Sequence, residues 1–72
     1  MNLCNRLKEI RLQKGLTQES LAEAVGVTRQ TIIAIEKAKF VPSVKLALQL
    51  ASTLDTSLQD LFWLENGKRS KA

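Results

Sequence analysis

The chain has 72 residues, of which 44% are hydrophobic and 25% are charged, and its formal net charge is +4. This length indicates one small domain, and the ordinary composition excludes a chain that is disordered throughout. The single cysteine, Cys4, excludes an intramolecular disulfide, and because histidine is absent as well, we expect no metal site.

Helical periodicity recurs along the chain between capping residues, whereas no run of residues alternates with the period of a β-strand. A first helix is expected over residues 3–14, with Cys4 as a half-buried residue, and Gly15 ends it. A second helix is expected over residues 18–25, and Gly26 ends it in a left-handed conformation. The residues expected on the buried sides of these two helices are Leu3, Leu7, Ile10, Leu21, Ala22 and Val25.

Three further helices are expected over residues 29–37, 44–54 and 58–64. A hydroxyl side chain stands before each helix after the first, where it can accept a hydrogen bond from a free backbone amide. These N-caps are Thr17, Thr28, Ser43 and Ser57. We therefore predict an all-α domain of five short helices over residues 3–64, followed by a basic C-terminal tail over residues 65–72.

The segment 18–37 combines features that two short helices crossing at a steep angle require. Ala22 lies on the inner side of the second helix, where a small side chain lets the third helix approach closely. Gly26, four residues later, allows the tight turn. Ile32 and Ile35 fill the space between the two helices. This spacing predicts a helix-turn-helix.

The outward face of the third helix carries side chains suited to contacting DNA bases. Helical spacing places Arg29, Gln30, Ile33 and Lys37 opposite the two buried isoleucines. Arginine can donate two parallel hydrogen bonds to guanine O6 and N7, and glutamine can bond adenine N6 and N7. A thymine methyl would cover Ile33. The alternative is a solvated polar face with one stray isoleucine.

The segment "LTQESLAEAVGVTRQTIIAIEKAKFVPS" resembles the helix-turn-helix of the Cro and phage-repressor family, also called the XRE family. The resemblance extends over roughly residues 3–64. It implies a lambda-repressor-like DNA-binding domain of five helices that usually acts as a dimer and inserts its third helix into the major groove.

Several residues around this motif are candidates for positioning the domain on DNA phosphates. Gln18 opens the second helix, where backbone amides and the helix dipole favour an anion, and the resemblance implies that it contacts phosphate. Thr28 and Thr31 can donate to phosphate or touch a base. Lys37 and Lys39 flank the end of the third helix, although each taken singly is equally well explained as a solvated charge.

The resemblance also implies two contacts inside the protein. Gln18 can brace Gln30 of the third helix. Arg11 of the first helix is expected to pair with Glu36 and so to pin the end of the third helix.

The chain departs from the family pattern after the third helix. The family commonly has Asn-Gly-Lys at this point, whereas this chain has Lys37-Ala38-Lys39. Alanine resists the conformation that the glycine normally takes. Either the third helix is longer than usual, or Ala38 is strained.

The fourth and fifth helices carry more apolar surface than so short a chain can bury. Trp63 and Leu64 in particular are left over near the C-terminal end, and exposed aromatic surface of this kind marks an interface. We therefore expect a twofold homodimer in which Trp63 and Leu64 contact the partner together with Val44 and Leu48. The alternative is that Trp63 folds over its own core.

The predicted function is a sequence-specific transcriptional regulator, most simply a repressor that binds a short inverted repeat in double-stranded DNA as a homodimer. The alternative is an antitoxin-like module that binds another protein through Trp63, Leu64 and the basic tail, with DNA binding secondary. Co-purification of a stable protein partner would favour this alternative.

Other classes of function are disfavoured. The chain has no histidine and no glycine-rich phosphate loop, which argues against an enzyme, and no cofactor or small-molecule ligand is evident. Its basic residues do not gather on one face of an apolar helix, which argues against binding at a membrane surface. Because no apolar run approaches the length of a membrane span and no signal-peptide core is present, we expect a cytoplasmic protein.

Overall fold

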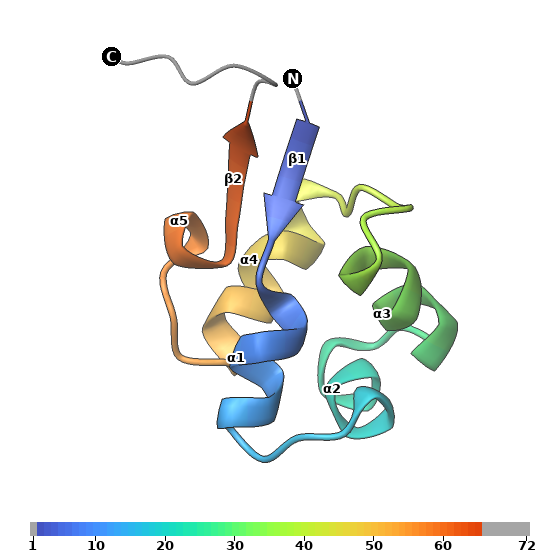
Figure 1. The fold of residues 1–72 in the computed structure, drawn as a ribbon. Coiled ribbons are helices and arrows are strands. Elements are labelled where there is room, and N and C mark those ends of the chain that lie inside the picture. Colours follow the sequence, from blue (N-terminus) through green and yellow to red (C-terminus); the bar gives the residue numbers. More distant parts are fainter. Residues whose placement is uncertain (1, 66–72) are drawn as a thin grey trace.

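The computed structural model describes residues 2–65, which form five helices and a two-stranded antiparallel sheet (Figure 1). In chain order the elements are β1 (Asn2–Asn5), α1 (Leu7–Gln13), α2 (Gln18–Val25), α3 (Arg29–Glu36), α4 (Val44–Thr53), α5 (Leu58–Leu61) and β2 (Phe62–Glu65). The five predicted helices are present, but the all-α class is wrong because it omits the sheet. Most of the predicted basic tail, residues 66–72, lies outside the described residues.

The sheet joins the two ends of the described chain, as Figure 1 shows. Its register places Cys4 opposite Trp63 and Asn5 opposite Phe62. Each strand has only four residues. The hydrophobic period of a segment shows only which of its sides is buried. It contains no information about hydrogen bonds to a strand at the other end of the chain. Periodicity therefore could not reveal this pairing.

The sheet shortens two of the predicted helices. α1 begins at Leu7 rather than at residue 3, and α5 ends at Leu61 rather than at residue 64. Cys4 is half-buried, as expected, but it lies in β1 and not in a helix. Its thiol donates a hydrogen bond to the carboxylate of Glu65 over 3.4 Å, and partial burial raises the pKa of this thiol, with Glu65 adding to the shift.

The core is one cluster of apolar side chains contributed by all five helices. The expected stripes of α1 and α2 are buried, except that Leu3 lies in β1 and packs against the cluster as a partly buried residue. The largest side chains that are fully enclosed are Leu7, Leu21, Ile32, Ile35, Leu50, Leu54 and Leu61. Between residues 2 and 65 there is no helix with the length and apolar character that crossing a bilayer requires.

The four predicted N-caps are confirmed. In each case the hydroxyl accepts a hydrogen bond from the backbone amide three residues later, which satisfies one of the free amides of the first turn. The pairs are Thr17 with Ser20, Thr28 with Thr31, Ser43 with Leu46 and Ser57 with Asp60. Thr17 and Ser20 form a reciprocal capping box, since the Ser20 side chain also accepts from the Thr17 amide over 3.0 Å.

The sequence left two alternatives for residues 37–39, a longer third helix or a strained Ala38, and the structure shows the second. α3 ends at Glu36, so it is not extended, and Ala38 takes the left-handed conformation with φ 59°. The amide of Ala38 donates to Ile35 O and that of Lys39 donates to Ala34 O, each over 2.9 Å. These bonds close the helix end in the way that a glycine usually does, at the cost of steric strain around the alanine Cβ.

Candidate nucleic-acid interface

The turn between α2 and α3 is as tight as the sequence predicted. Gly26 has φ 76°, and the amide of Val27 donates to Ala22 O over 3.0 Å. Ala22 is only 2% exposed, so α3 packs closely against α2 at this point. Thr28 then caps α3, whose first residue is Arg29. The spacing of the two helices is therefore fixed by a small residue, a left-handed glycine and a cap.

The two faces of α3 differ as expected. Ile32 and Ile35 are buried at 0% and 1% exposure. Arg29 and Gln30 are exposed at the start of the helix, and Ile33 is half-buried on the same side. Lys37 is exposed just beyond the last helical residue. The polar side chains at the start of α3 are thus presented to solvent on a helix held from behind by isoleucines.

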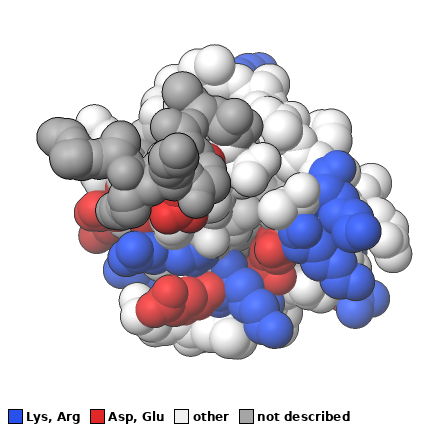
Figure 2. All heavy atoms as spheres, turned by 45° about the horizontal axis from the view of Figure 1, so that its top comes forward, with Lys and Arg blue, Asp and Glu red and all other residues white. Residues whose placement is uncertain are grey.

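Positive charge gathers on the side of the molecule that carries α3. Figure 2 shows Lys and Arg side chains clustered at the right of the view, on the side where α3 lies in Figure 1, and a second group at the lower centre and left that is interleaved with acidic side chains. α3 and the turn after it contribute Arg29, Lys37 and Lys39. Their only carboxylate, Glu36, is paired with Arg11 inside the protein. The exposed charges of α3 and this turn are therefore all positive, although the neighbouring α2 carries the exposed carboxylates of Glu19 and Glu23.

Over all the described residues, positive and negative charges are nearly balanced. Three of the chain's eleven Lys and Arg residues, Lys68, Arg69 and Lys71, lie in residues 66–72, whereas all seven Asp and Glu residues lie in residues 2–65. Eight basic against seven acidic residues leave a net charge of only +1 for residues 2–65. Attraction of a polyanion thus depends on where the charges of α3 lie and on the basic C-terminal residues, rather than on a uniformly positive surface.

The C-terminal end of α3 is fastened to α1 by Arg11 and Glu36, the two residues expected to pair. Arg11 Nε donates to Glu36 Oε2 over 2.7 Å, and the two side chains are 7% and 5% exposed. Arg11 Nη1 also donates to Leu16 O over 2.9 Å, which holds the loop that precedes α2. The buried charges are thus paired and further hydrogen-bonded, as their removal from water requires.

A second anchor of α3 was missed by the sequence analysis. Asn5 Nδ2 donates to Ile35 O over 3.0 Å, while Asn5 Oδ1 accepts from the amide of Leu7 over the same distance. One amide side chain therefore satisfies both the start of α1 and the end of α3. The preference of asparagine for helix starts was a usable signal, but the first helix was expected to begin before this residue.

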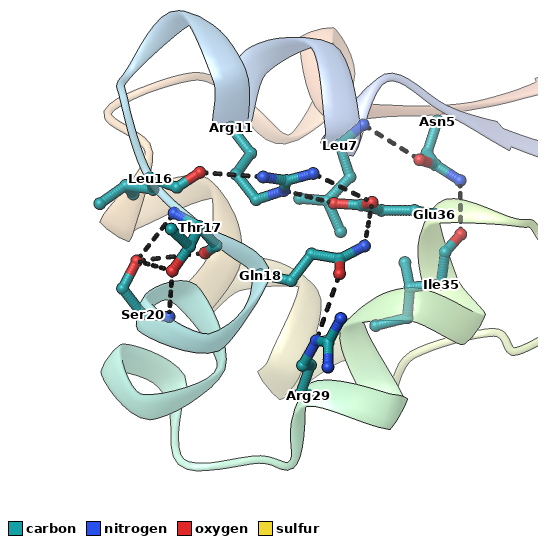
Figure 3. Close-up of polar contacts among 10 residues, drawn as sticks. All are labelled: Asn5, Leu7, Arg11, Leu16, Thr17, Gln18, Ser20, Arg29, Ile35 and Glu36. Carbon is teal, nitrogen blue, oxygen red and sulfur yellow. Dashed lines mark hydrogen bonds and ion pairs between the residues drawn. The ribbon is translucent and has the colours of Figure 1, made fainter.

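Gln18 lies between the two ends of α3 (Figure 3). Its Nε2 donates to Glu36 Oε1 over 3.1 Å, and its Oε1 accepts from Arg29 Nε over 3.4 Å. The expected brace between Gln18 and Gln30 is therefore wrong, because Arg29 is the residue that Gln18 contacts. Arg29 is the first residue of α3, whereas Gln30 is turned about 100° further around the helix.

Thr28 and Thr31, expected at phosphate, contact each other. Their hydroxyl oxygens are 3.1 Å apart, and Thr28 Oγ1 also accepts from the Thr31 amide over 3.3 Å. One hydroxyl hydrogen is used between the two side chains, so the other hydroxyl hydrogen is available to an acceptor outside the protein. Lys37 and Lys39 are exposed on the turn that follows.

The residues expected at a dimer interface have different surroundings. Val44, Leu48 and Leu64 are 73%, 51% and 62% exposed. Trp63 is half-buried, and the guanidinium of Arg6 lies over its ring, 5.1 Å from the ring centre. Three of the four side chains thus remain uncovered, while Trp63 is partly covered by its own chain.

Comparison with known proteins identifies relatives over nearly the same residues. The helix-turn-helix family model matches residues 7–61. YgzD of Bacillus subtilis, named an uncharacterized HTH-type transcriptional regulator, is 51% identical over 61 residues, which are 85% of this chain and 92% of that protein. A protein of Methanocaldococcus jannaschii with the same description is 50% identical over 62 residues, covering 86% of this chain and 94% of its own length.

Solved structures agree with this fold. The restriction-modification controller protein C.AhdI from Aeromonas hydrophila superimposes with a TM-score of 0.70 at 35% identity, covering 75% of this chain and 78% of its own. A putative DNA-binding protein from Bacteroides fragilis superimposes with a TM-score of 0.77 at 28% identity, covering 83% of this chain and 97% of its own.

Proposed function

The chain belongs to the helix-turn-helix (XRE) family of DNA-binding transcriptional regulators, and on this basis we propose that it is a sequence-specific regulator, most simply a repressor, that places α3 in the major groove. This proposal is supported by which side chains of α3 are exposed and which are buried. Arg29 and Gln30 are exposed at its start, while Ile32 and Ile35 hold it from behind. A short helix held in this way can present its first turn to base edges without moving.

Three residues of α3 are proposed to contact bases. The contact with Gln18 occupies only Nε of Arg29, so both Nη groups are left for guanine O6 and N7. Gln30 would bond adenine N6 and N7. Ile33, which the protein covers only in part, would complete its burial against a thymine methyl. Each good bidentate pair is worth about 1–3 kcal/mol of discrimination against a wrong base.

Phosphate contacts are proposed for the residues that surround this first turn. Gln18 uses one hydrogen of its Nε2 amide for Glu36 and keeps the other for a phosphate oxygen. One of the hydroxyls of Thr28 and Thr31 has a hydrogen to donate. Lys37 and Lys39 would meet the backbone beyond the end of α3. These contacts would set the register of α3 in the groove without selecting a sequence.

The regulator is proposed to act as a twofold homodimer. Val44, Leu48 and Leu64 are large apolar side chains that the protein leaves exposed, and Trp63 is covered only in part. A dimer would place its two recognition helices about 34–36 Å apart, one turn of DNA, so that the target is a short inverted repeat. Residues 3–64 would form the DNA-binding domain, and the basic residues after it would add sequence-independent attraction to DNA.

Selection of bound sites from random double-stranded DNA tests this function. The wild-type protein is expected to recover a palindromic motif, and Arg29→Ala is expected to recover the same motif with one relaxed base pair in each half-site. A useful control is Lys45→Ala, which removes an exposed charge on α4 and should leave the motif unchanged. Recovery of no motif by the wild-type protein would contradict sequence-specific binding.

A further inference from the structure

We propose that Asn5 is a positioning residue for DNA binding: its side chain fastens β1 to the end of α3 and so keeps closed the strained turn that presents Lys37 and Lys39. This inference rests on the proposed function and deepens it, because it assigns a part in DNA binding to a residue of β1, outside the helix-turn-helix. Figure 3 shows Asn5 between the start of α1 and Ile35 of α3.

The side-chain amide of Asn5 can make its two bonds in one orientation only. Its Oδ1 accepts from the backbone amide of Leu7, and its Nδ2 donates to Ile35 O, each over 3.0 Å. A backbone amide only donates and a backbone carbonyl only accepts, so exchanging the oxygen and the nitrogen of the side chain would lose both bonds. The donor of Asn5 is therefore directed at the end of α3.

The backbone of Asn5 is itself held by the sheet. The register places Asn5 opposite Phe62, which is buried. The pairing continues beyond the strand, because the amide of Arg6 donates to Leu61 O over 3.1 Å. The side chain of Asn5 therefore ties the end of α3 to the strands formed by the two ends of the described chain.

Asn5 bonds the same oxygen on which the turn after α3 closes. Ile35 O accepts from Asn5 Nδ2 over 3.0 Å and from the amide of Ala38 over 2.9 Å, which uses both lone pairs of the carbonyl. With φ 59°, Ala38 makes the closed turn less favourable than a glycine would. Opening the last turn of α3 would relieve this strain, but it would also move Ile35 O and break its bond with Asn5. Asn5 therefore opposes opening.

The closed turn sets the positions of two exposed lysines. Lys37 and Lys39 stand on either side of Ala38, so their backbone follows the conformation of this residue. A segment that is already ordered loses less conformational freedom when it binds. Asn5 would thus raise the affinity for DNA through phosphate contacts, which set register but do not select a sequence.

DNA binding by Asn5→Asp tests the inference. This change keeps an oxygen for the amide of Leu7 but replaces the donor by a second oxygen that faces Ile35 O. Asn2→Asp is the matched control, because it makes the same change of charge at an exposed position of the same strand. We expect Asn5→Asp to bind the selected duplex about threefold or more weakly than Asn2→Asp, with a salt slope lower by about 0.9 for each lysine that loses its phosphate. The preference for the selected duplex over one with a changed base pair should be equal in the two variants.

Ala38→Gly separates this role from a general loss of stability. Glycine adopts the left-handed conformation without strain, so the turn should then close without the help of Asn5. In the Ala38→Gly background, Asn5→Asp should bind to within about twofold of Asn2→Asp. Equal affinities of Asn5→Asp and Asn2→Asp in the wild-type background, or a loss that Ala38→Gly does not reduce, would overturn the inference. A wild-type protein that binds every duplex equally would instead contradict the proposed function itself.

Amide hydrogen exchange of the free protein gives a readout that does not involve DNA. The amides of Ala38 and Lys39 donate the two hydrogen bonds that close the turn. In Asn5→Asp both should exchange about tenfold or more faster than in Asn2→Asp, while the amide of Leu50 inside α4 should be affected less. Equal rates at the turn in the two variants, or the same acceleration at Leu50, would show that Asn5 does not hold the turn.

Discussion

Arg11 of α1 and Glu36 of α3 lie 25 positions apart in the sequence and form an ion pair of 2.7 Å that the protein encloses almost completely. The pair fixes the end of α3 opposite to the one proposed to contact bases. Since Glu36 also receives the amide of Gln18, it links the frame of the domain to the proposed DNA-contacting side chains.

Removing one member of this pair should destabilise the protein strongly. Glu36→Ala leaves the guanidinium of Arg11 buried without a counter-charge, and we expect the free energy of unfolding to fall by about 3–5 kcal/mol. Denaturant unfolding measures this loss, with exposed Glu19→Ala on α2 as the control. The double variant Arg11→Met, Glu36→Leu should be more stable than Glu36→Ala, because it leaves no buried charge. A loss for Glu36→Ala as small as that for Glu19→Ala would contradict the structural role of the pair.

Ala38→Gly should stabilise the protein. Ala38 has φ 59°, a conformation that glycine adopts without steric cost, so we expect a gain of about 1 kcal/mol in the free energy of unfolding. Ala24→Gly is the matched control, because Ala24 is exposed inside α2 and the same change there should cost about 0.5–1 kcal/mol. Thermal unfolding of both variants checks the opposite signs, and two losses would contradict the strain at Ala38.

Lys37→Ala should weaken DNA binding without changing its sequence preference. A lysine at a phosphate contributes about 0.9 to the slope of log K against log salt concentration, so the slope should fall by about this amount. Binding titrations at several salt concentrations measure it. Lys45→Ala, an exposed lysine on α4, is the control and should leave the slope unchanged. A slope that is the same for Lys37→Ala and the wild type would place Lys37 away from phosphate.

Leu48→Glu should shift the protein from dimer to monomer. Leu48 is 51% exposed on α4, and a carboxylate there would have to be desolvated in the proposed interface. Leu12→Glu is the matched control, since Leu12 is 58% exposed on α1 and is not one of the four residues proposed to contact the partner. Sedimentation equilibrium over a range of protein concentrations compares the two. A wild-type protein that is monomeric both alone and with DNA would refute the dimer.

Much of the helical fold could be predicted from sequence because its signals are local. Thr17, Thr28, Ser43 and Ser57 lie next to the helices that they cap, and Gly26 lies at the turn that it permits. The sheet could not be predicted in this way, because its strands pair across nearly the whole described chain and each is too short to show a period.

The candidate site was predictable in its composition but not in its contacts. Helical spacing was enough to place Arg29 and Gln30 on the outward face. It could not show that Gln18 reaches Arg29 and Glu36, since this depends on how α2 and α3 cross. Asn5 was missed because its role requires β1 to deliver it beside the end of α3. Local pattern thus indicated which side chains of α3 face outward, and tertiary packing decided their partners.

The proposed contact between the outward face of α3 and DNA is tested by the change in backbone amide chemical shifts when the selected duplex is added to the 72-residue protein. We expect the largest changes at the start of α2 and along α3, centred on Gln18, Arg29 and Gln30. Largest changes at α4, α5 or β2, with α3 unaffected, would contradict it.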